Sequence, residues 1–424
     1  MTSQQLFSTR PEALTSSGCS DKSQRSLFWT GLWSVIAALV PVMRTSVNAG
    51  WQLPQRHIEY MILLALVVAA LLGRVARPAG FPIWIAGAVV IPTAGFISGF
   101  SSSISASLTI AVELALICLL APAVFRYEIL RTKSFVPCVL SAFLVSQTLS
   151  AATGVLQLTG ADVFGRGAVF GRSTGFAGHP NVLGLMAVIA LLVSLTMMRN
   201  APRPAQAALW GAFAVNAVSL VGTGSLSSML AGAVGLMVYA IGRRRLVAAF
   251  FAALAAGTSI FIVGGAWAVS VVEYRMAVVT GADDVGGAAS VDVRLRTYQW
   301  ALEYLSDDPL FGVGMDDASS GTFDGVTAVH TYLLHAWYQG GLLLFLWFLA
   351  VTALLLTTIL RAMAGSRSVE AAAVLAAFLT FASMSAFFAQ DQYWLPLLFA
   401  IATLPAVGMS KHARTPTVDT GLIR

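Results

Sequence analysis

Apolar residues in this chain gather into long, nearly uninterrupted runs. Runs of roughly 17 to 25 residues are long enough to cross a bilayer as helices. The pattern therefore predicts an all-α, polytopic transmembrane bundle with about 12 spans. The expected spans are about 27–43, 57–73, 82–99, 106–125, 135–156, 180–198, 205–221, 225–241, 246–270, 331–360, 369–389 and 393–409. This count is most sensitive to whether residues 205–241 form two spans or one.

The composition and the placement of charge agree with a membrane protein. Hydrophobic residues make up 57% of the 424 residues and charged residues only 10%, whereas about a quarter of the residues in a soluble domain are charged. With the N-terminus in the cytoplasm, 18 of the 25 Lys and Arg fall on cytoplasmic segments and seven lie outside, as the positive-inside rule requires. The net charge of +6 is therefore a signal of topology, and it does not indicate a nucleic-acid partner.

The spacing of the runs divides the chain into five parts. We expect a disordered cytoplasmic tail at 1–26, transmembrane helices 1–9 at 27–270, a large external loop with short helices at about 271–330, helices 10–12 at 331–409, and a cytoplasmic tail at 410–424. The loop is too small to be an independent enzyme domain. Its chemistry must therefore be read together with the membrane bundle.

Ionisable residues are scarce within the expected spans, and Glu113 is the clearest one. Such a residue is a functional candidate because burying its charge is costly. The alternative is that Glu113 is protonated, or bonded to a polar group of a neighbouring helix such as Gln147 or Asn216. We favour that alternative, because an ion-coupled carrier would show more than one such group.

The external stretch "GRSTGFAGHPNVLGL" at 171–185 is the first candidate for chemistry. Arg166, Arg172 and His179 precede Pro180, and proline is favoured at the first position of a helix. The backbone N–H groups at that helix end, together with Arg172, would form an anion site. Gly171, Gly175 and Gly178 allow close approach of backbone to a ligand. Alternatively, Arg172 reaches lipid phosphates and the Gly-His-Pro sequence only starts a helix.

The second stretch, "SVDVRLRTYQWALEYLSDDPLFGVGMDD" at 290–317, predicts an amphipathic helix over 292–306. Leu295, Tyr298, Leu302 and Leu305 repeat at helical spacing. The Asp-Asp-Pro sequence then ends the helix, because the residue before a proline disfavours helical dihedral angles.

Arg296, Trp300 and Glu303 lie along one line of that helix. Arg294 is rotated about 160° from Arg296, at ~100° per residue, so a regular helix cannot direct both arginines to one ligand. Arg296 is either a surface ion-pair partner of Asp292 or a guanidinium that binds a phosphate.

Asp316 and Asp317, which follow in "FGVGMDD", are a possible metal site. Adjacent carboxylates alone are a weak signal, so we interpret them as part of a turn and expect no metal.

The third stretch, "AVHTYLLHAWYQGGLLLF" at 328–345, holds His330 and His335 at the start of the tenth expected span. A histidine at a membrane boundary is more often a satisfied polar residue than a catalyst. Histidine nevertheless titrates near neutral pH and suits a general base. The placement of His330 on the same face as Arg172 and Arg296 favours the catalytic interpretation.

These three stretches together resemble the bacterial O-antigen ligase and O-antigen polymerase family of polytopic membrane glycosyltransferases. "GRSTGFAGHPN" is similar to the family's arginine-to-His-Pro-Asn segment. "RTYQWALEYLSDDPLFGVG" is similar to its Arg-x-x-x-Trp segment followed by Pro-Leu-x-Gly-x-Gly, and "HTYLLHAWYQGG" to its histidine segment with a glycine pair. Thr331 stands where the family usually has asparagine.

The resemblance implies transfer of a glycan from a polyprenyl-diphosphate carrier to an acceptor hydroxyl, with inversion at the anomeric carbon and without a metal or other cofactor. It implies that Arg172 and Arg296 bind the diphosphate and that His330 activates the acceptor. Arg294, Trp300 and Arg166 are further substrate-binding candidates. The implied partners are the lipid-linked glycan, a glycan or lipid acceptor and membrane lipids, with the bacterial inner membrane as the location and both termini cytoplasmic.

Three alternatives stay open. Ligase and polymerase differ only in the acceptor, and the single dominant loop slightly favours ligase. A transporter or flippase of lipid-linked sugars would need a polar path through the membrane, yet the spans show little beyond Glu113, Gln147 and Asn216. A non-catalytic scaffold of an envelope-assembly complex is the third alternative.

Overall fold

The structure is a computed structural model, and it describes residues 17–43, 55–163, 167–168, 171–199, 201–244, 290–316, 329–365, 368–385 and 391–404. Over these ranges the chain is helical and contains no strand, as predicted. The α-helices are α1 (Ser17–Leu39), α2 (Gln55–Leu71), α3 (Phe81–Ser98), α4 (Ile104–Arg131), α5 (Phe135–Leu158), α6 (Pro180–Met198), α7 (Arg203–Gly222), α8 (Leu226–Gly242), α10 (Ser290–Asp307), α12 (Tyr332–Gly365), α13 (Val369–Ala382) and α14 (Asp391–Thr403). Short 3-10 turns η1 (Val40–Val42) and η3 (Gly99–Ser101) continue α1 and α3.

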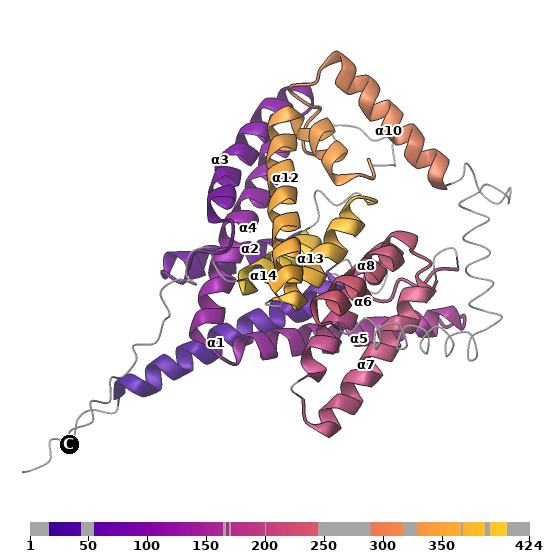
Figure 1. The fold of residues 1–424 in the computed structure, drawn as a ribbon. Coiled ribbons are helices and arrows are strands. Elements are labelled where there is room, and N and C mark those ends of the chain that lie inside the picture. Colours follow the sequence, from indigo (N-terminus) through magenta and orange to yellow (C-terminus); the bar gives the residue numbers. More distant parts are fainter. Residues whose placement is uncertain are drawn as a thin grey trace, which may run out of the picture.

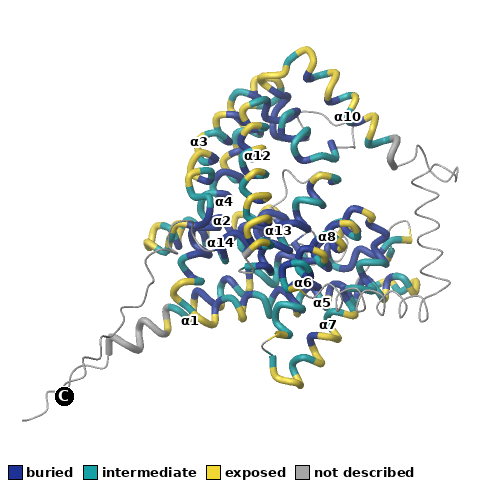
Figure 2. The backbone as a smooth tube through the Cα atoms, in the orientation of Figure 1, coloured by how far each residue is buried: buried dark blue, intermediate teal, exposed yellow. Residues whose placement is uncertain are grey.

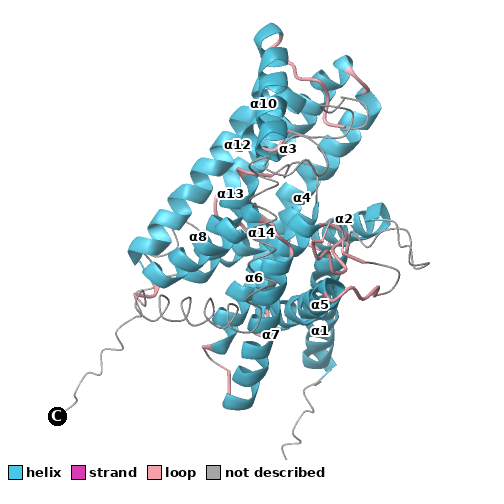
Figure 3. Cartoon of the chain, turned by 90° about the vertical axis from the view of Figure 1, so that its right-hand side faces the viewer, coloured by secondary structure: helices cyan, strands magenta, loops and turns pink. Residues whose placement is uncertain are grey.

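The helices form two groups that share a centre. In one group α3 packs against α4 and α12, and in the other α5, α6 and α7 pack against one another. Helix α13 joins the two groups because it packs on α12, α6 and α8 (Figures 1 and 3). Helix α10, drawn in orange in Figure 1, lies at the outer end of the molecule and packs on α12.

The interior is mainly apolar but also holds polar side chains, while many large apolar side chains face outward. In α5, Gln147 and Gln157 are buried, whereas Val145, Leu149 and Leu156 are 51–62% exposed. The same outward apolar surface recurs along the outer helices, while α6 and α13 at the centre are mostly buried (Figure 2). A surface of this kind fits a hydrocarbon environment, because soluble proteins rarely expose contiguous apolar patches.

Within the described residues, six helices are long and apolar enough to cross a membrane. They are the segments Phe81–Ser101, Ile104–Arg131, Phe135–Leu158, Pro180–Met198, Arg203–Gly222 and Tyr332–Ala364. Three of the other predicted spans are shorter apolar helices, at Ser26–Val42, Leu226–Gly242 and Val369–Ala382. The predicted span 246–270 lies outside the described residues. A membrane bundle is therefore supported, while the count of about 12 spans stays a prediction.

Ion pairs join helix ends that the predicted topology places on one face. Glu128 at the end of α4 accepts hydrogen bonds from Arg74, at 2.7 Å from Nε and 2.9 Å from Nη2. Glu370 at the start of α13 pairs with Arg199 after α6, at 3.1 Å, and with Arg243 after α8. Because all these helix ends were assigned to the cytoplasmic side, the contacts agree with helices that alternate in direction.

Gln147 and Asn216, the expected partners of Glu113, bond to each other. Gln147 of α5 donates to Asn216 Oδ1 of α7 at 3.1 Å. Glu113 instead has a side-chain hydrogen bond with Tyr60 of α2 and lies near Arg56. The expectation that a neighbouring polar group accompanies Glu113 is confirmed, but the suggested partners were wrong.

Candidate functional site

Arg172 is held in a defined orientation by two neighbouring elements. Its Nε donates to the backbone carbonyl of Thr223 at 2.7 Å, just after α7. Its Nη2 donates to Asn181 Oδ1 at 2.9 Å, in the first turn of α6. These bonds fix the plane of the half-buried guanidinium, so Arg172 does not extend freely toward lipid phosphates.

The backbone that follows Arg172 is anchored on α5. Gln157 Oε1 accepts from the backbone N–H groups of Thr174 and Gly175, both at 2.9 Å. Gly175 has φ of +49°, and a Cβ there would collide with the Ser150 carbonyl. The predicted close approach at this glycine is therefore between two backbone segments, and it fixes the loop against the membrane helix.

The start of α6 follows the sequence prediction closely. Pro180 is the first helical residue, and His179 is the N-cap, whose Nδ1 accepts from the backbone N–H of Asn181 at 3.2 Å. The Gly-His-Pro sequence therefore starts a helix, and His179 is its capping residue. The same bond occupies the Asn181 N–H, one of the backbone donors of the expected anion site. Fewer backbone donors are then left for an anion, and Arg172 is the main remaining donor group.

Helix α10 exists where predicted and ends at Asp307, before Pro309. Of the four residues with helical spacing, Leu305 is buried and Tyr298 is half buried. Thr297, Ala301 and Leu305 are buried, whereas Leu295 and Leu302 are half exposed. A large aromatic residue of α12 packs against this part of α10.

Tyr338 of α12 is that residue. Its ring centroid lies 4.8 Å from the Trp300 ring and 5.5 Å from the Tyr304 ring. Ala301 and Val313 complete this small core, which is separate from the main one. Aromatic pairs at such distances stabilise packing beyond their buried area. Trp300 is therefore half buried against α12, while Arg296, one turn earlier, is exposed.

The segment 309–315 enters a break in α12. Gly341 has φ of +69° and ψ of −171° inside the helix, and the break leaves backbone groups of α12 without their helical partners. The N–H groups of Val313 and Gly314 donate to the carbonyls of Tyr338 and Gln339, both at 2.9 Å. The backbone of "PLFGVG" thus replaces the missing helical hydrogen bonds.

Glycines are required at this junction. A Cβ on Gly341 would collide with the Leu310 carbonyl, and one on Gly314 would collide with Ser102 Oγ in the α3–α4 turn. Both residues also have positive φ, which L side chains rarely adopt. Met315 N–H then donates to Ser107 Oγ of α4 at 2.9 Å. The segment 309–315 is therefore attached to both α12 and α4.

The two histidines differ in their surroundings. His330 is half buried and lies two residues before the start of α12. His335 is inside α12 and only 3% exposed. We call α10, the segment 309–315 and α12 the α10–α12 unit. His330 lies beside this unit, where it could contact a substrate, whereas His335 is part of the packed helix.

The structure brings only some of the predicted residues together. Trp300 and the helix that carries Arg294 and Arg296 pack on α12, which begins just after His330. Arg172 lies where α5, α6 and α7 meet, which we call the Arg172 corner. Helix α8, which follows the turn at Thr223, packs on α12. Arg166 lies outside the described residues, as does Asp317. Where the structure describes the chain, no group of three or more His, Cys, Asp or Glu is placed to hold a metal.

With these contacts defined, the chain can be compared with known proteins. A model of the O-antigen ligase family matches residues 208–349. This match supports the resemblance of the chain to the O-antigen ligase and polymerase family. The matched part of the chain runs from α7 into α12 and includes Arg294, Arg296, Trp300 and His330. Arg172 precedes it but bonds to Thr223, which is inside it. A search of curated proteins finds no match.

Several residues that shape the site were not singled out from the sequence. Tyr338, Gly341, Gln157, Asn181 and Thr223 position the candidates through contacts with other helices. The sequence did contain a signal for Gly341. It belongs to the glycine pair of "YQGG", and glycines inside an apolar helical run indicate a possible break in the helix. Thr223 contributes only a backbone carbonyl, which no residue pattern can reveal.

Proposed function

We propose that this protein is a glycosyltransferase that moves a glycan from a polyprenyl-diphosphate carrier to an acceptor hydroxyl at the outer face of the bacterial inner membrane. The observation that carries the proposal is the O-antigen ligase family match, which spans the α10–α12 unit and reaches the turn that holds Arg172. The family supports a membrane glycosyltransferase in general. The donor, the acceptor and the mechanism are our inference.

Arg172 and Arg296 are the proposed diphosphate ligands. A guanidinium presents several donors in one plane and matches phosphate oxygens well. Arg172 is already oriented by Thr223 and Asn181, so little reorganisation is needed when the diphosphate binds. Arg294, Arg166 and the Trp300 ring are further proposed contacts for the donor.

His330 is the proposed general base. It takes the proton from the acceptor hydroxyl, whose oxygen attacks the anomeric carbon of the donor sugar. The bond between that carbon and the phosphate oxygen breaks, and polyprenyl diphosphate leaves with the bonding electrons. The configuration at the anomeric carbon inverts. A diphosphate is a good leaving group, so neutralisation of its charge and alignment of the acceptor are the main requirements.

The test is transfer from a synthetic polyprenyl-diphosphate glycan by the purified protein. We expect Arg172→Ala and Arg296→Ala each to abolish transfer, while both variants insert and purify normally. Turnover should survive addition of a chelator, because we propose no metal. Normal transfer by both variants would contradict the proposed site, and loss of turnover with the chelator would contradict the metal-free step.

Ligase and polymerase are distinguished by their products in a deletion strain. We favour ligase. A ladder of glycans that persists on the carrier lipid, unattached to the terminal acceptor, indicates that the missing protein is a ligase. Single repeats on the terminal acceptor indicate a polymerase, and an unchanged glycan profile would favour a scaffold.

A further inference from the structure

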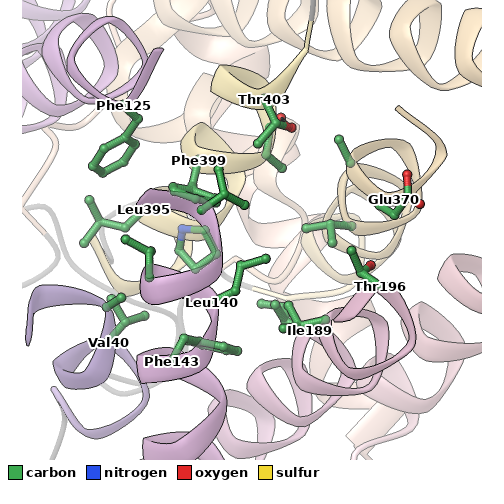
Figure 4. Close-up of a pocket in the computed structure, with 18 of the residues that line it drawn as sticks. Val40, Phe125, Leu140, Phe143, Ile189, Thr196, Glu370, Leu395, Phe399 and Thr403 are labelled. Atoms are coloured by element: carbon green, nitrogen blue, oxygen red, sulfur yellow. Dashed lines mark hydrogen bonds between the residues drawn. The ribbon is translucent and has the colours of Figure 1, made fainter. Parts of the chain in front are cut away.

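An apolar cavity of about 300 Å³ lies between α1, α4, α5, α6, α13 and α14 (Figure 4). Its wall consists mainly of aliphatic and aromatic side chains, such as Val40, Leu140, Phe143, Ile189 and Phe399. An engineered apolar cavity of about 150 Å³ stays dry and binds benzene. The larger cavity therefore has room for a longer hydrocarbon.

The polar groups of the cavity gather on one side. In Figure 4 the side chains of Thr196, Glu370 and Thr403 lie along its edge, away from Val40 and Phe125. The hydroxyls of the two threonines donate within their own helices, to the carbonyls of Leu192 and Ala400. These threonines therefore offer little to water, and the edge is defined chemically by Glu370.

Two arginines stand at this edge. Glu370 pairs with Arg199 at 3.1 Å and with Arg243. Two guanidinium groups and one carboxylate leave one positive charge beside the opening of an apolar cavity. Arg199 is 48% exposed at its side chain, so this charge is accessible from outside. The combination of an apolar cavity and an accessible cation fits an amphiphile with an anionic head group.

This edge is far from the proposed transferase site. Helix α6 connects the two, because Asn181 contacts Arg172 and Arg199 contacts Glu370. Eighteen residues at about 1.5 Å each separate Asn181 and Arg199 by about 27 Å, close to the ~30 Å thickness of a hydrocarbon core. The cavity edge therefore faces the opposite leaflet from Arg172.

We propose that this cavity binds a hydrocarbon chain of an anionic membrane phospholipid, whose head group contacts Arg199 and Arg243. The lipid fills the space between α1, α5 and α13 and holds these helices together. The site is separate from the donor site, so it is occupied whether or not the protein transfers glycans.

The test uses the full chain, purified in dodecyl maltoside and stripped of lipid. Phosphatidylglycerol or phosphatidylcholine with identical acyl chains is added, and retained lipid is counted by native mass spectrometry alongside the thermal unfolding midpoint. One net positive charge favours phosphatidylglycerol about fivefold, and its binding should raise the midpoint. Equal retention of both lipids by the wild-type chain would overturn the proposal.

Variants locate the bound lipid. Leu140→Trp fills the cavity and should abolish retention and the rise in midpoint, while Val145→Trp, on the 62% exposed face of the same helix, should leave both unchanged. Ala37→Leu is a milder filling variant for use if Leu140→Trp does not fold. Arg199→Gln should reduce the preference for phosphatidylglycerol. Unchanged retention in a folded filling variant would place the lipid elsewhere and refute the site.

Discussion

The Arg172 corner and the α10–α12 unit bring cations to the same predicted face in different ways. Arg172 is half buried and fixed by a carbonyl and an amide from two helices. Arg296 is exposed, on a helix that is itself fixed by the Tyr338 ring and by the break at Gly341. The Arg172 corner fixes the side chain of Arg172, whereas the α10–α12 unit fixes only the helix backbone that carries Arg296. We therefore expect the two arginines to differ in their tolerance of substitution.

The largest expected effect concerns the histidines of the α10–α12 unit. His330→Ala should reduce the transfer rate about 100-fold or more, because a positioned general base contributes that much. His335→Ala should mainly lower the unfolding midpoint, because His335 is buried in α12. Transfer rates and thermal unfolding of both variants distinguish the two roles. If only His335→Ala loses transfer while remaining stable, the roles must be exchanged.

Arg172→Lys should be nearly as damaging. A lysine cannot donate to both Thr223 and Asn181 in one plane, and loss of an oriented donor costs about 100-fold in rate. The variant should insert and purify normally, and the measurement is initial transfer rate at saturating donor. Arg203→Ala, at an exposed position at the start of α7, is the control. A Lys variant with wild-type rate would show that charge alone suffices at position 172.

Gly341→Ala tests the junction beneath Arg296. The positive φ alone costs about 1–3 kcal/mol, and the collision with the Leu310 carbonyl adds to it. We expect an unfolding free energy lower by about 2 kcal/mol or more. Gly160→Ala has positive φ but no neighbour within 4 Å, and Gly211→Ala has neither problem within α7. The loss of stability should be largest for Gly341→Ala, smaller for Gly160→Ala and smallest for Gly211→Ala. A loss for Gly341→Ala no larger than that for Gly160→Ala would mean that a side chain does not strain the junction.

Arg296→Lys should retain more activity than Arg172→Lys. Because the Arg296 side chain is exposed on α10, a flexible cation can still reach a phosphate, and we expect a loss of about tenfold or less. The loss should appear mainly in KM and grow with salt concentration, since exposed charges are screened. Equal losses for the two Lys variants would remove the distinction between the regions.

The smallest effect is expected at Tyr338. Tyr338→Phe keeps the ring against Trp300 and Tyr304 and should leave amide hydrogen exchange in α10 nearly unchanged. Tyr338→Ala removes two ring contacts worth about 0.5–1.5 kcal/mol each, so exchange in 290–307 should rise about tenfold or more. Exchange in α6 is the internal reference. Equal exchange in both variants would mean that the ring does not hold α10.

The sequence predicted helices well because long apolar runs and proline starts act locally. Pro180 began α6 and the Asp-Asp-Pro sequence ended α10, as expected. The spacing of apolar residues in α10 predicted an amphipathic helix but not which side is covered, because Leu295 and Leu302 are half exposed and Tyr338, from another helix, packs on Trp300. The support of Arg172 could not be predicted either, since it depends on the carbonyl of a residue 51 positions away.

The break at Gly341 also determines when the α3–α4 end of the molecule can be completed during synthesis. Met315 bonds to Ser107 across 208 residues, and the segment before it pairs with carbonyls around Gly341. The α3–α4 end therefore lacks its contact with Met315 until the ribosome has added more than half of the chain. Contacts of such sequence separation form late because the intervening chain must first be closed into a loop. Nascent chains that stop before residue 341 should leave this end open to proteases from outside.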